Sequence, residues 1–276
     1  MGGIKADMTG KSEHLLAKII SYQGDERFSQ ALSDWLETIV PFDNITVLAY
    51  FSARQPKMLF AKANRKSVHA NFENVYMAGA YLLDPFYDLH ISRAPAGVYR
   101  LNDIAPDQFH RNRYFRDYYS NTSLTDELAF VSYPAKGTSV HVCLGRDASS
   151  NSRFSARQIA ATQRVAPVVL ALIERHWSEL DASDGSQEDD IEARLIRALG
   201  SEHDVWLSPR QAEVGLMILR GHSSMSIALK LAISPETVKV FRKQLYRKCG
   251  ISSQAELFNM ILPLLGGNNS ARSKQS

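Results

Sequence analysis

The chain has 276 residues, of which 45% are hydrophobic and 22% are charged, and its formal net charge is +3. These proportions are typical of a globular protein and exclude wholesale disorder. No apolar run approaches the ~18 residues of a membrane helix, and residues 1–11 lack the apolar segment of a secretory signal. The two cysteines, Cys143 and Cys249, form neither a disulfide framework nor a zinc motif. We therefore expect a cytoplasmic protein with no metal, no other cofactor and no membrane partner.

Residues 1–177 alternate between helical and extended patterns. Helices are expected over 12–40, with an interruption near Gly24, and over 68–83, 108–120 and 155–177, the last opened by a capping box at Ser155. Strands are expected over 44–51, 57–63, 97–101, 126–135 and 138–146. These elements predict an α+β fold, in which an antiparallel sheet of about five strands forms the middle layer of an α/β/α sandwich.

Residues 76–87, YMAGAYLLDPFY, combine a carboxylate with several aromatic side chains. Asp84, fixed beside Pro85, can accept a hydrogen bond from a ligand N–H or cation while the rings close over it. The alternative is that Asp84 caps a helix, that Pro85 is its first residue and that the rings belong to the core. The candidate ligand-binding residues are Tyr76, Tyr81, Asp84, Phe86 and Tyr87, with Tyr99 further along the chain.

Two further groups of residues have patterns that favour a role in packing over a role in binding. The aromatic residues between Phe109 and Tyr119, including Tyr118, predict the inner face of an amphipathic helix, with a pocket wall as the alternative. His141 and Cys143 alternate on one predicted strand and therefore share one of its faces. A buried core strand is the favoured interpretation there.

An acidic segment separates the two halves of the chain. Residues 178–192 contain seven acidic residues and no basic one, together with few apolar residues. Such a composition predicts a linker, and a solvated loop inside one domain is the alternative. We therefore expect a sensor domain over 1–177, a linker over 178–205, a second domain over 206–265 and a flexible tail over 266–276.

Residues 206–265 carry eight Lys and Arg against three acidic residues, which indicates a polyanionic partner. Serines that cap helices, prolines in first turns and glycines that end helices predict an all-α module of four short helices. These signals are Ser208, Pro209, Gly221, Ser223, Ser234, Pro235, Gly250 and Ser253. The middle pair of helices is predicted to form a helix-turn-helix.

The third of these helices carries the basic residues. Val238, Phe241 and Leu245 recur at helical spacing and are expected to face the core. Lys239, Lys243 and Arg247 line the opposite side, which suits the DNA major groove. A solvated basic face on a packing helix is the alternative.

Residues 207–257 resemble the LuxR-type helix-turn-helix of bacterial transcription regulators. The matching residues are LSPRQAEV, Gly221, Ile227-Ala228, ISPETVKV, Arg242 and RKCGISSQAEL. The resemblance implies that Lys239, Val240 and Lys243 enter the groove, and that Thr237, Arg242 and Arg247 lie near the DNA backbone. Ser226 and Phe241 depart from the Glu and His that are usual in the family, which affects local packing more than DNA binding.

The N-terminal order of elements resembles GAF/PAS-like sensor domains and the autoinducer-binding domain found upstream of such modules. Residues 76–87 resemble the Y…DP motif of acyl-homoserine-lactone receptors, in which the Asp contacts the ligand amide. Those receptors carry a Trp upstream of that Asp, where this chain has Asn71 and Phe72. A different small molecule is therefore expected, with the lactone as the alternative.

Together these features predict a ligand-responsive, DNA-binding transcription regulator. Its expected partners are a double-stranded DNA operator, a small-molecule effector of unknown identity and a second copy of the chain, because one helix-turn-helix reads only a half-site. RNA polymerase is a further candidate partner. The alternative to an effector is a protein partner of the sensor. No catalytic spacing or cofactor loop is present, so no enzyme is expected. The helix over 155–177 is a candidate dimer surface through Val165, Val168, Val169 and Leu172, or it packs on its own sheet.

Overall fold

The computed structural model describes residues 3–52, 54–117, 119–180 and 191–266. Tyr118, residues 181–190 of the predicted linker and residues 267–276 of the predicted tail lie outside these ranges. The chain divides into two compact units. The first comprises Met1–Val68, His90–Asp103 and Leu124–Ser186, and the second comprises His69–Leu89, Ile104–Ser123 and Gln187–Ser276. Within the described ranges, no helix is both long and apolar enough to cross a membrane.

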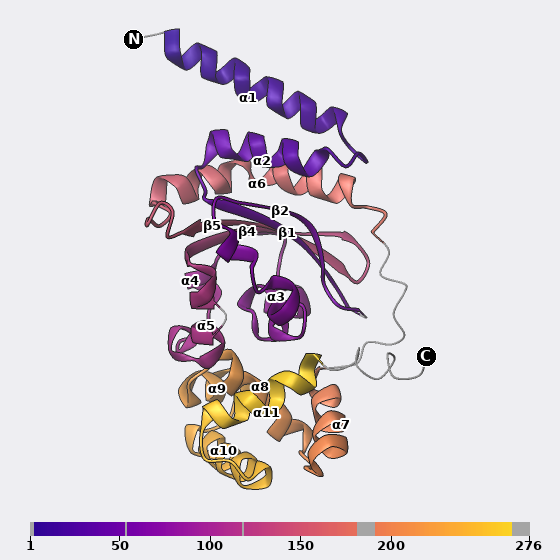
Figure 1. Cartoon of the computed structure of the whole chain (residues 1–276), viewed down its shortest axis with the longest axis vertical. Helices are drawn as coiled ribbons and strands as arrows, with labels where there is room; N and C mark the ends of the chain where they lie inside the picture. The colour runs from indigo at the N-terminus through magenta and orange to yellow at the C-terminus, as the bar shows by residue number, and fades with distance from the viewer. Residues whose placement is uncertain (1–2, 53, 118, 181–190, 267–276) are drawn as a thin grey trace. The chain divides into compact units, whose positions relative to one another are not determined.

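The first unit is built on one five-stranded sheet, in which neighbouring strands are antiparallel (Figure 1). Its spatial order is β2-β1-β5-β4-β3. The strands are β1 (Asn44–Phe51), β2 (Lys57–Ala63), β3 (Gly97–Arg100), β4 (Leu124–Ala135) and β5 (Thr138–Asp147). The predicted α+β fold with a five-stranded antiparallel sheet is confirmed.

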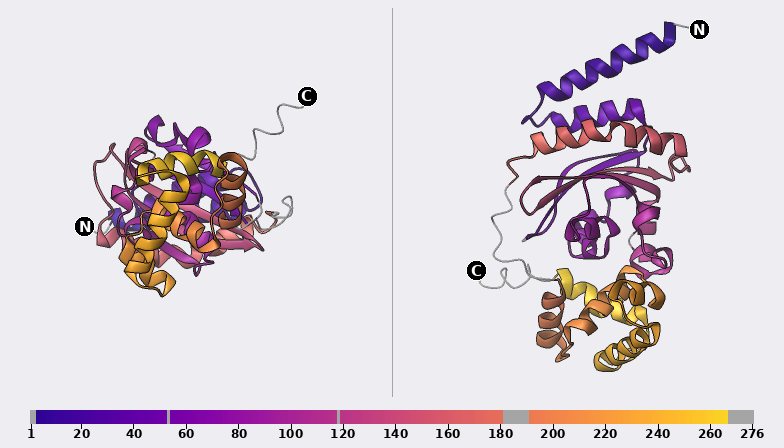
Figure 2. Two further views of the ribbon diagram at one scale, coloured as in Figure 1. Left: turned by 90° about the horizontal axis from the view of Figure 1, so that it is seen from below. Right: turned by 180° about the vertical axis from the view of Figure 1, so that it is seen from behind.

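Helices cover one face of this sheet. They are α1 (Gly3–Ser21), α2 (Phe28–Ile39) and α6 (Ala156–His176), and a short 3-10 helix, η1 (Lys66–His69), follows β2. Figures 1 and 2 show α2 and α6 side by side over the sheet, with α1 on the outer side of α2. Ser155 and Gln158 form the predicted capping box of α6. The helix break near Gly24 is confirmed, and Gly24 has a positive φ of 77°.

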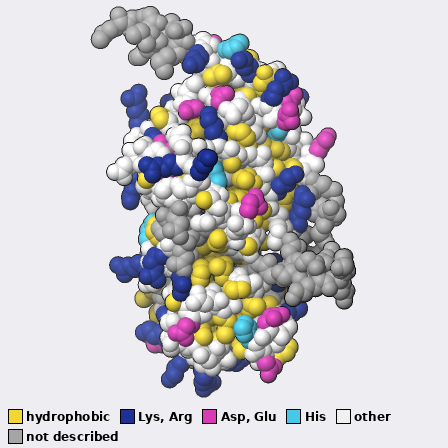
Figure 3. Space-filling view, viewed as in Figure 1, with side chains coloured by type: hydrophobic (Ala, Val, Ile, Leu, Met, Phe, Trp, Pro, Cys, Tyr) yellow, Lys and Arg dark blue, Asp and Glu magenta, His cyan; other side chains and the backbone are white. Residues whose placement is uncertain are grey.

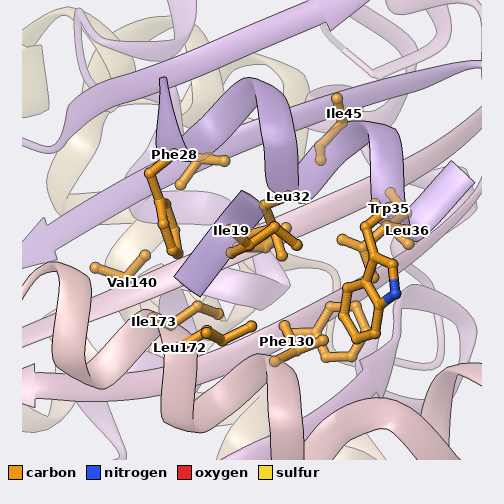
Figure 4. Packing of buried hydrophobic residues seen from close by; sticks show 14 of the residues in the cluster. Ile19, Phe28, Leu32, Trp35, Leu36, Ile45, Phe130, Val140, Leu172 and Ile173 are labelled. Atoms are coloured by element: carbon orange, nitrogen blue, oxygen red, sulfur yellow. The ribbon is translucent and has the colours of Figure 1, made fainter. Parts of the chain in front are cut away.

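The core of the first unit lies between these helices and the sheet (Figure 4). Phe28, Leu32 and Leu36 of α2 pack with Val140 of β5, and all four side chains are fully buried. Each such side chain stabilises the fold by about 1.5–3 kcal/mol. On α6, Val169 and Leu172 are buried in this core, whereas Val168 is 41% exposed. Val165 is half-buried and packs against the same core, so three of the four residues considered for dimerisation pack within their own unit.

The second unit combines short segments from the first half of the chain with the C-terminal helices. The short segments are η2 (Phe72–Tyr76, a π-helix), η3 (Ala80–Leu83), α3 (Pro85–Ile91, whose last two residues belong to the first unit), the end of α4 (Leu101–Ile104), η4 (Phe109–Arg111), α5 (Arg113–Asp117) and η5 (Tyr119–Thr122). The C-terminal helices are α7 (Ile191–His203), α8 (Pro209–Arg220), α9 (Ser224–Leu231), α10 (Pro235–Cys249) and α11 (Gln254–Gly266).

Two predicted helices, 68–83 and 108–120, are present only as short pieces. Gly79 interrupts the first with a φ of 136°, and large aromatic side chains such as Phe72, Tyr81 and Phe109 are buried at several places along both segments. One regular helix directs its buried side chains to a single face, so these segments bend to bury rings on more than one side. Helix α7 occupies the second half of the predicted linker, and its Leu195 and Leu199 are fully buried.

The four predicted C-terminal helices are confirmed as α8 to α11. Ser208 and Ser234 cap α8 and α10 by accepting hydrogen bonds from Gln211 and Thr237 backbone N–H groups. Gly221 and Gly250 end these helices in the left-handed conformation that glycine tolerates. The predicted sequence signals therefore act through the expected capping contacts.

Candidate functional site

Helix α10 is the second helix of the helix-turn-helix formed with α9. Val238 and Leu245 on its inner face are fully buried and fix it against α8 and α9. A polar network adds to this packing, since Gln211 Nε2 donates to Gln244 Oε1 at 3.0 Å and Lys248 Nζ donates to Gln211 Oε1 at 2.9 Å. The helix is thus held rigidly while its outer face stays open.

The predicted DNA-binding residues all lie along the open side of α10. Lys239, Val240, Lys243 and Arg247 are exposed, and Thr237 and Arg242 are half-buried. The exposed fraction of Val240 is 52%, which leaves its side chain accessible for contact with a thymine methyl. Figure 3 shows Lys and Arg side chains on the surface around α10, which is labelled in Figure 1. DNA contact by each residue stays a prediction.

Ser226 and Phe241, the two residues that depart from the family pattern, both make local contacts or are partly buried. Ser226 Oγ lies 2.9 Å from Nδ1 of His222, so a short polar contact forms within this region. Phe241 is half-buried beside the basic face. Burial and the nearby Lys230 lower the pKa of His222 to about 4, so the ring is neutral near pH 7.

Asp84 lies at the centre of the predicted ligand segment and is buried. Its Oδ2 accepts a hydrogen bond from the Tyr76 hydroxyl at 2.7 Å, and its Oδ1 accepts one from the Phe86 backbone N–H at 2.8 Å. Asp84 thus caps α3, which is one of the two interpretations of the sequence. Burial raises the pKa of Asp84 to about 6, although these hydrogen bonds act in the opposite direction.

Five of the six predicted ligand-binding residues lie together in the second unit. Tyr76, Tyr81, Phe86 and Tyr87 are buried around Asp84, and the Tyr81 and Tyr87 rings meet edge to face with centroids 5.1 Å apart. Tyr99 lies on β3 of the first unit, where its hydroxyl donates to the Pro95 carbonyl at 2.6 Å. Ligand contact by these residues stays a prediction.

The second aromatic group is also buried. Phe109 and Tyr114 are fully buried and Tyr119 nearly so, but they lie on three separate short pieces and not on the inner face of one amphipathic helix, as the sequence predicted. Their rings surround one another, with the Phe109 and Tyr119 centroids 5.8 Å apart.

Within the second unit, the ligand segment contacts the end of α8. Arg220 forms an ion pair with Asp88 of α3, with Nη1 2.8 Å from Oδ1, and its Nε donates to the Leu82 carbonyl at 3.3 Å. Asn112 Nδ2 donates to the Arg220 carbonyl at 3.0 Å, and the Gln108 N–H donates to the Gly221 carbonyl at 2.9 Å. These contacts join residues more than 100 positions apart, and no spacing in the sequence pointed to them.

A small cavity of about 190 Å³ lies at this junction. Residues from three segments, 83–88, 104–107 and 220–230, line it, and the charged and polar ones include Asp84, Asp88, Asp107, Arg220, His222 and Lys230. Among the described residues, no three metal-ligating side chains lie together as a metal site requires. The Arg220 contacts make this junction a polar connection between the ligand segment and α8, the helix against which α10 packs.

A helix-turn-helix whose second helix exposes a basic face defines a DNA-binding regulator. Residues 205–261 match the family model of bacterial regulatory proteins of the luxR family. The C-terminal module is a LuxR-family helix-turn-helix domain, and the chain is a DNA-binding regulator.

Three known proteins are similar to this chain. An Aeromonas salmonicida protein, named as a helix-turn-helix transcriptional regulator in the exeN 3′ region, is 29% identical over 184 residues, which cover 65% of this chain and 93% of the relative. The response regulator GacA of Pseudomonas aeruginosa is 41% identical over 51 residues, 18% of this chain and 24% of GacA. The crystal structure of the VqsR LBD domain from Pseudomonas aeruginosa has 25% identity and a TM-score of 0.50, and the match covers 63% of this chain and 97% of that one.

Proposed function

We propose that the chain is a ligand-responsive bacterial transcription regulator that binds its operator as a homodimer. In this proposal residues 1–177 are the sensor, 178–205 connect it to the DNA-binding domain at 206–265, and 266–276 form a tail. The similarity to the VqsR LBD, a ligand-binding domain by its name, supports a small-molecule effector. Because the target is bacterial DNA, we propose action in the cytoplasm, with RNA polymerase as a further partner.

The observation that supports control of DNA binding by a ligand is the ion pair between Asp88 and Arg220. Asp88 follows the capping residue Asp84 on α3, and Arg220 is the last residue of α8. A ligand that donates a hydrogen bond to Asp84 competes with the Tyr76 hydroxyl and displaces the start of α3. Since α8 packs against α10, such a displacement shifts the population of DNA-binding geometries.

Operator binding is tested with the full-length chain and duplexes selected from a random DNA pool. We expect the double substitution Lys239→Ala and Lys243→Ala to abolish specific binding, because both side chains lie on the exposed face of α10. The matched control is Lys57→Ala, an exposed lysine on β2. Retention of sequence-specific binding by the double variant would contradict the assignment of α10.

The effector is sought by thermal shift of the full-length chain against a metabolite library that includes N-acyl-homoserine lactones. A true ligand raises the Tm progressively with its concentration. We expect Asp84→Asn to weaken the response to the hit, because Asn cannot supply a charged acceptor. Stabilisation by the lactones alone would favour the lactone-receptor alternative, and stabilisation by no metabolite would favour a protein partner.

A further inference from the structure

The cavity of about 190 Å³ in the second unit is lined by charges of both signs. It contains the carboxylates of Asp84, Asp88 and Asp107, the guanidinium of Arg220 and the ammonium group of Lys230. All of its lining residues lie on η3, α3, α4, α8 and α9 or on the connections between them, and none lies on a strand. The cavity is therefore a different place from the sheet of the first unit.

Two of the charges that line the cavity have no partner of opposite charge. Asp88 and Arg220 neutralise each other in the ion pair described above. Asp107 Oδ1 accepts a hydrogen bond from the backbone N–H of Ser223 at 2.9 Å, but this donor is neutral. Within the part of the chain that the structure describes, neither Asp107 nor Lys230 forms an ion pair. Both side chains are exposed, so a ligand reaches them from the solvent.

The imidazole of His222 lies close to both of these charges and neutralises neither. Burial and the nearby Lys230 lower its pKa to about 4, against the opposite effect of Asp88 and Asp107. The ring is therefore neutral near pH 7 and leaves the carboxylate and the ammonium group as separate charges.

The geometry of α9 sets the spacing of the two charges. Asp107 binds the N-terminal end of this helix at Ser223, whereas Lys230 lies seven residues further along. At 1.5 Å per residue this is about 10 Å along the helix axis, and a helical lysine side chain leans back toward the N-terminus, which shortens the distance between the charges. The spacing thus suits a short molecule that carries one charge at each end.

We propose that this cavity binds a small zwitterion, whose ammonium group pairs with Asp107 and whose carboxylate pairs with Lys230. The volume is below the 300–1,000 Å³ or so of pockets for drug-sized ligands, so the ligand has few heavy atoms. Residues 104–106, Ile-Ala-Pro, line the cavity beside Asp107 and suit a short methylene chain. The recognising charges are other groups than the Asp84 carboxylate, so the site does not rest on the proposed function. A bound zwitterion would connect residues 104–107 to both ends of α9.

The test compares 4-aminobutanoate with two probes that each lack one of its charges. Pentanoate has a methyl group in place of the ammonium group, and 4-aminobutanamide has an uncharged amide in place of the carboxylate. Each is titrated into the ¹⁵N-labelled full-length chain, and the amide resonance of Ser223, which donates to Asp107, is followed by NMR. We expect a saturable shift with 4-aminobutanoate and an affinity about fivefold lower for each of the other probes, the upper value for a partly exposed ion pair. Equal affinities for the three probes, or no saturable shift with 4-aminobutanoate, would overturn the proposal.

Two variants assign the charges to their partners. Asp107→Asn keeps an oxygen that accepts from the Ser223 N–H but removes the charge, so the preference for 4-aminobutanoate over pentanoate is expected to vanish. Lys230→Gln is expected to remove the preference over 4-aminobutanamide instead. The matched controls Asp103→Asn and Lys57→Gln, at exposed positions of the first unit, should keep both preferences.

The variants also separate this site from the proposed effector site. If both preferences survive in Asp107→Asn and in Lys230→Gln, the zwitterion binds elsewhere and the assignment is wrong. Binding of 4-aminobutanoate that Asp84→Asn weakens and these two variants do not would likewise contradict this site, while it would support the proposed function.

Discussion

Asp84 is held in a buried position by two donors, and this burial has a measurable consequence for stability. Its carboxyl has a pKa of about 6 in the folded chain against 3.8 for an ordinary Asp. Between these values the folded state binds a proton that the unfolded state does not. Stability therefore falls as the pH rises through this window.

We expect Asp84→Asn to remove this pH dependence. The amide does not titrate, so the free energy of unfolding of the variant relative to the wild type should move in favour of Asn by about 2.4 kcal/mol between pH 4 and pH 7. Urea unfolding at several pH values measures the difference. The exposed Asp103→Asn serves as the control. A drift shared by both variants would mean that Asp84 is not desolvated.

At the scale of residues, the sequence predicted which residues of one short segment lie together better than it predicted contacts between distant segments. The aromatic side chains around Asp84 followed from one continuous segment, 76–87, and the five predicted residues of that segment lie together, whereas Tyr99 lies elsewhere. The partners of Arg220 and Ser139 did not follow, because Asp88 and His90 lie far from them in the chain. On β5, the alternation of Ser139 and His141 indicated that the two side chains share a face of the sheet. It could not reveal that His90 Nδ1 lies 2.8 Å from Ser139 Oγ.

Among the elements, the end of α8 differs from the end of α10 in its surroundings. Both helices end in a glycine with positive φ, 97° at Gly221 and 64° at Gly250. A Cβ added to Gly221 would lie 2.8 Å from Asn112 Nδ2 and 3.0 Å from the Phe109 Cα, whereas one added to Gly250 would meet nothing within 4 Å. An alanine at Gly250 would therefore cost only backbone strain, whereas an alanine at Gly221 would add the cost of a steric clash.

We expect Gly250→Ala to lower the free energy of unfolding by about 1 kcal/mol, the usual cost of a side chain in the left-handed conformation. Gly221→Ala should cost a further 1–3 kcal/mol, roughly the range for overpacking, because the added methyl meets backbone as well as the Asn112 side chain. Urea unfolding of the two variants provides the comparison. Equal destabilisation would show that residues 108–112 do not contact the end of α8 in solution.

Elements with strong local signals were predicted well, and elements shaped by packing were not. The caps at Ser155, Ser208 and Ser234 are set by contacts within four residues, so local sequence determines them. The short pieces between 66 and 83 bend to bury aromatic rings, which depends on the rest of the unit. The buried Leu195 and Leu199 of α7 are spaced as on one helical face, but the acidic residues before them suggested a linker instead.

At the scale of the whole molecule, the ligand segment and α8 share one compact unit. Arg220 is 14% exposed in its side chain and Asp88 is 36% exposed, so the pair is partly shielded from water. Arg220 also donates to the Leu82 carbonyl, so its guanidinium binds two groups of one distant segment, residues 82–88. Under the proposed mechanism this junction carries the effect of a ligand from Asp84 to the helices that read DNA.

The junction makes the Asp88–Arg220 pair a test of coupling between ligand and operator. A double-mutant cycle with Asp88→Ala and Arg220→Ala should give an interaction free energy of about 1 kcal/mol in unfolding, as for a partly exposed ion pair. Binding of an effector typically changes the operator Kd about 5- to 150-fold. With the effector found by thermal shift, we expect this ratio of Kd values to be at least about threefold smaller in Asp88→Ala than in the wild type. Asp103→Ala should leave that ratio unchanged. An unaltered ratio in Asp88→Ala, with the pair confirmed by the cycle, would show that the effect of the ligand reaches α10 by another route.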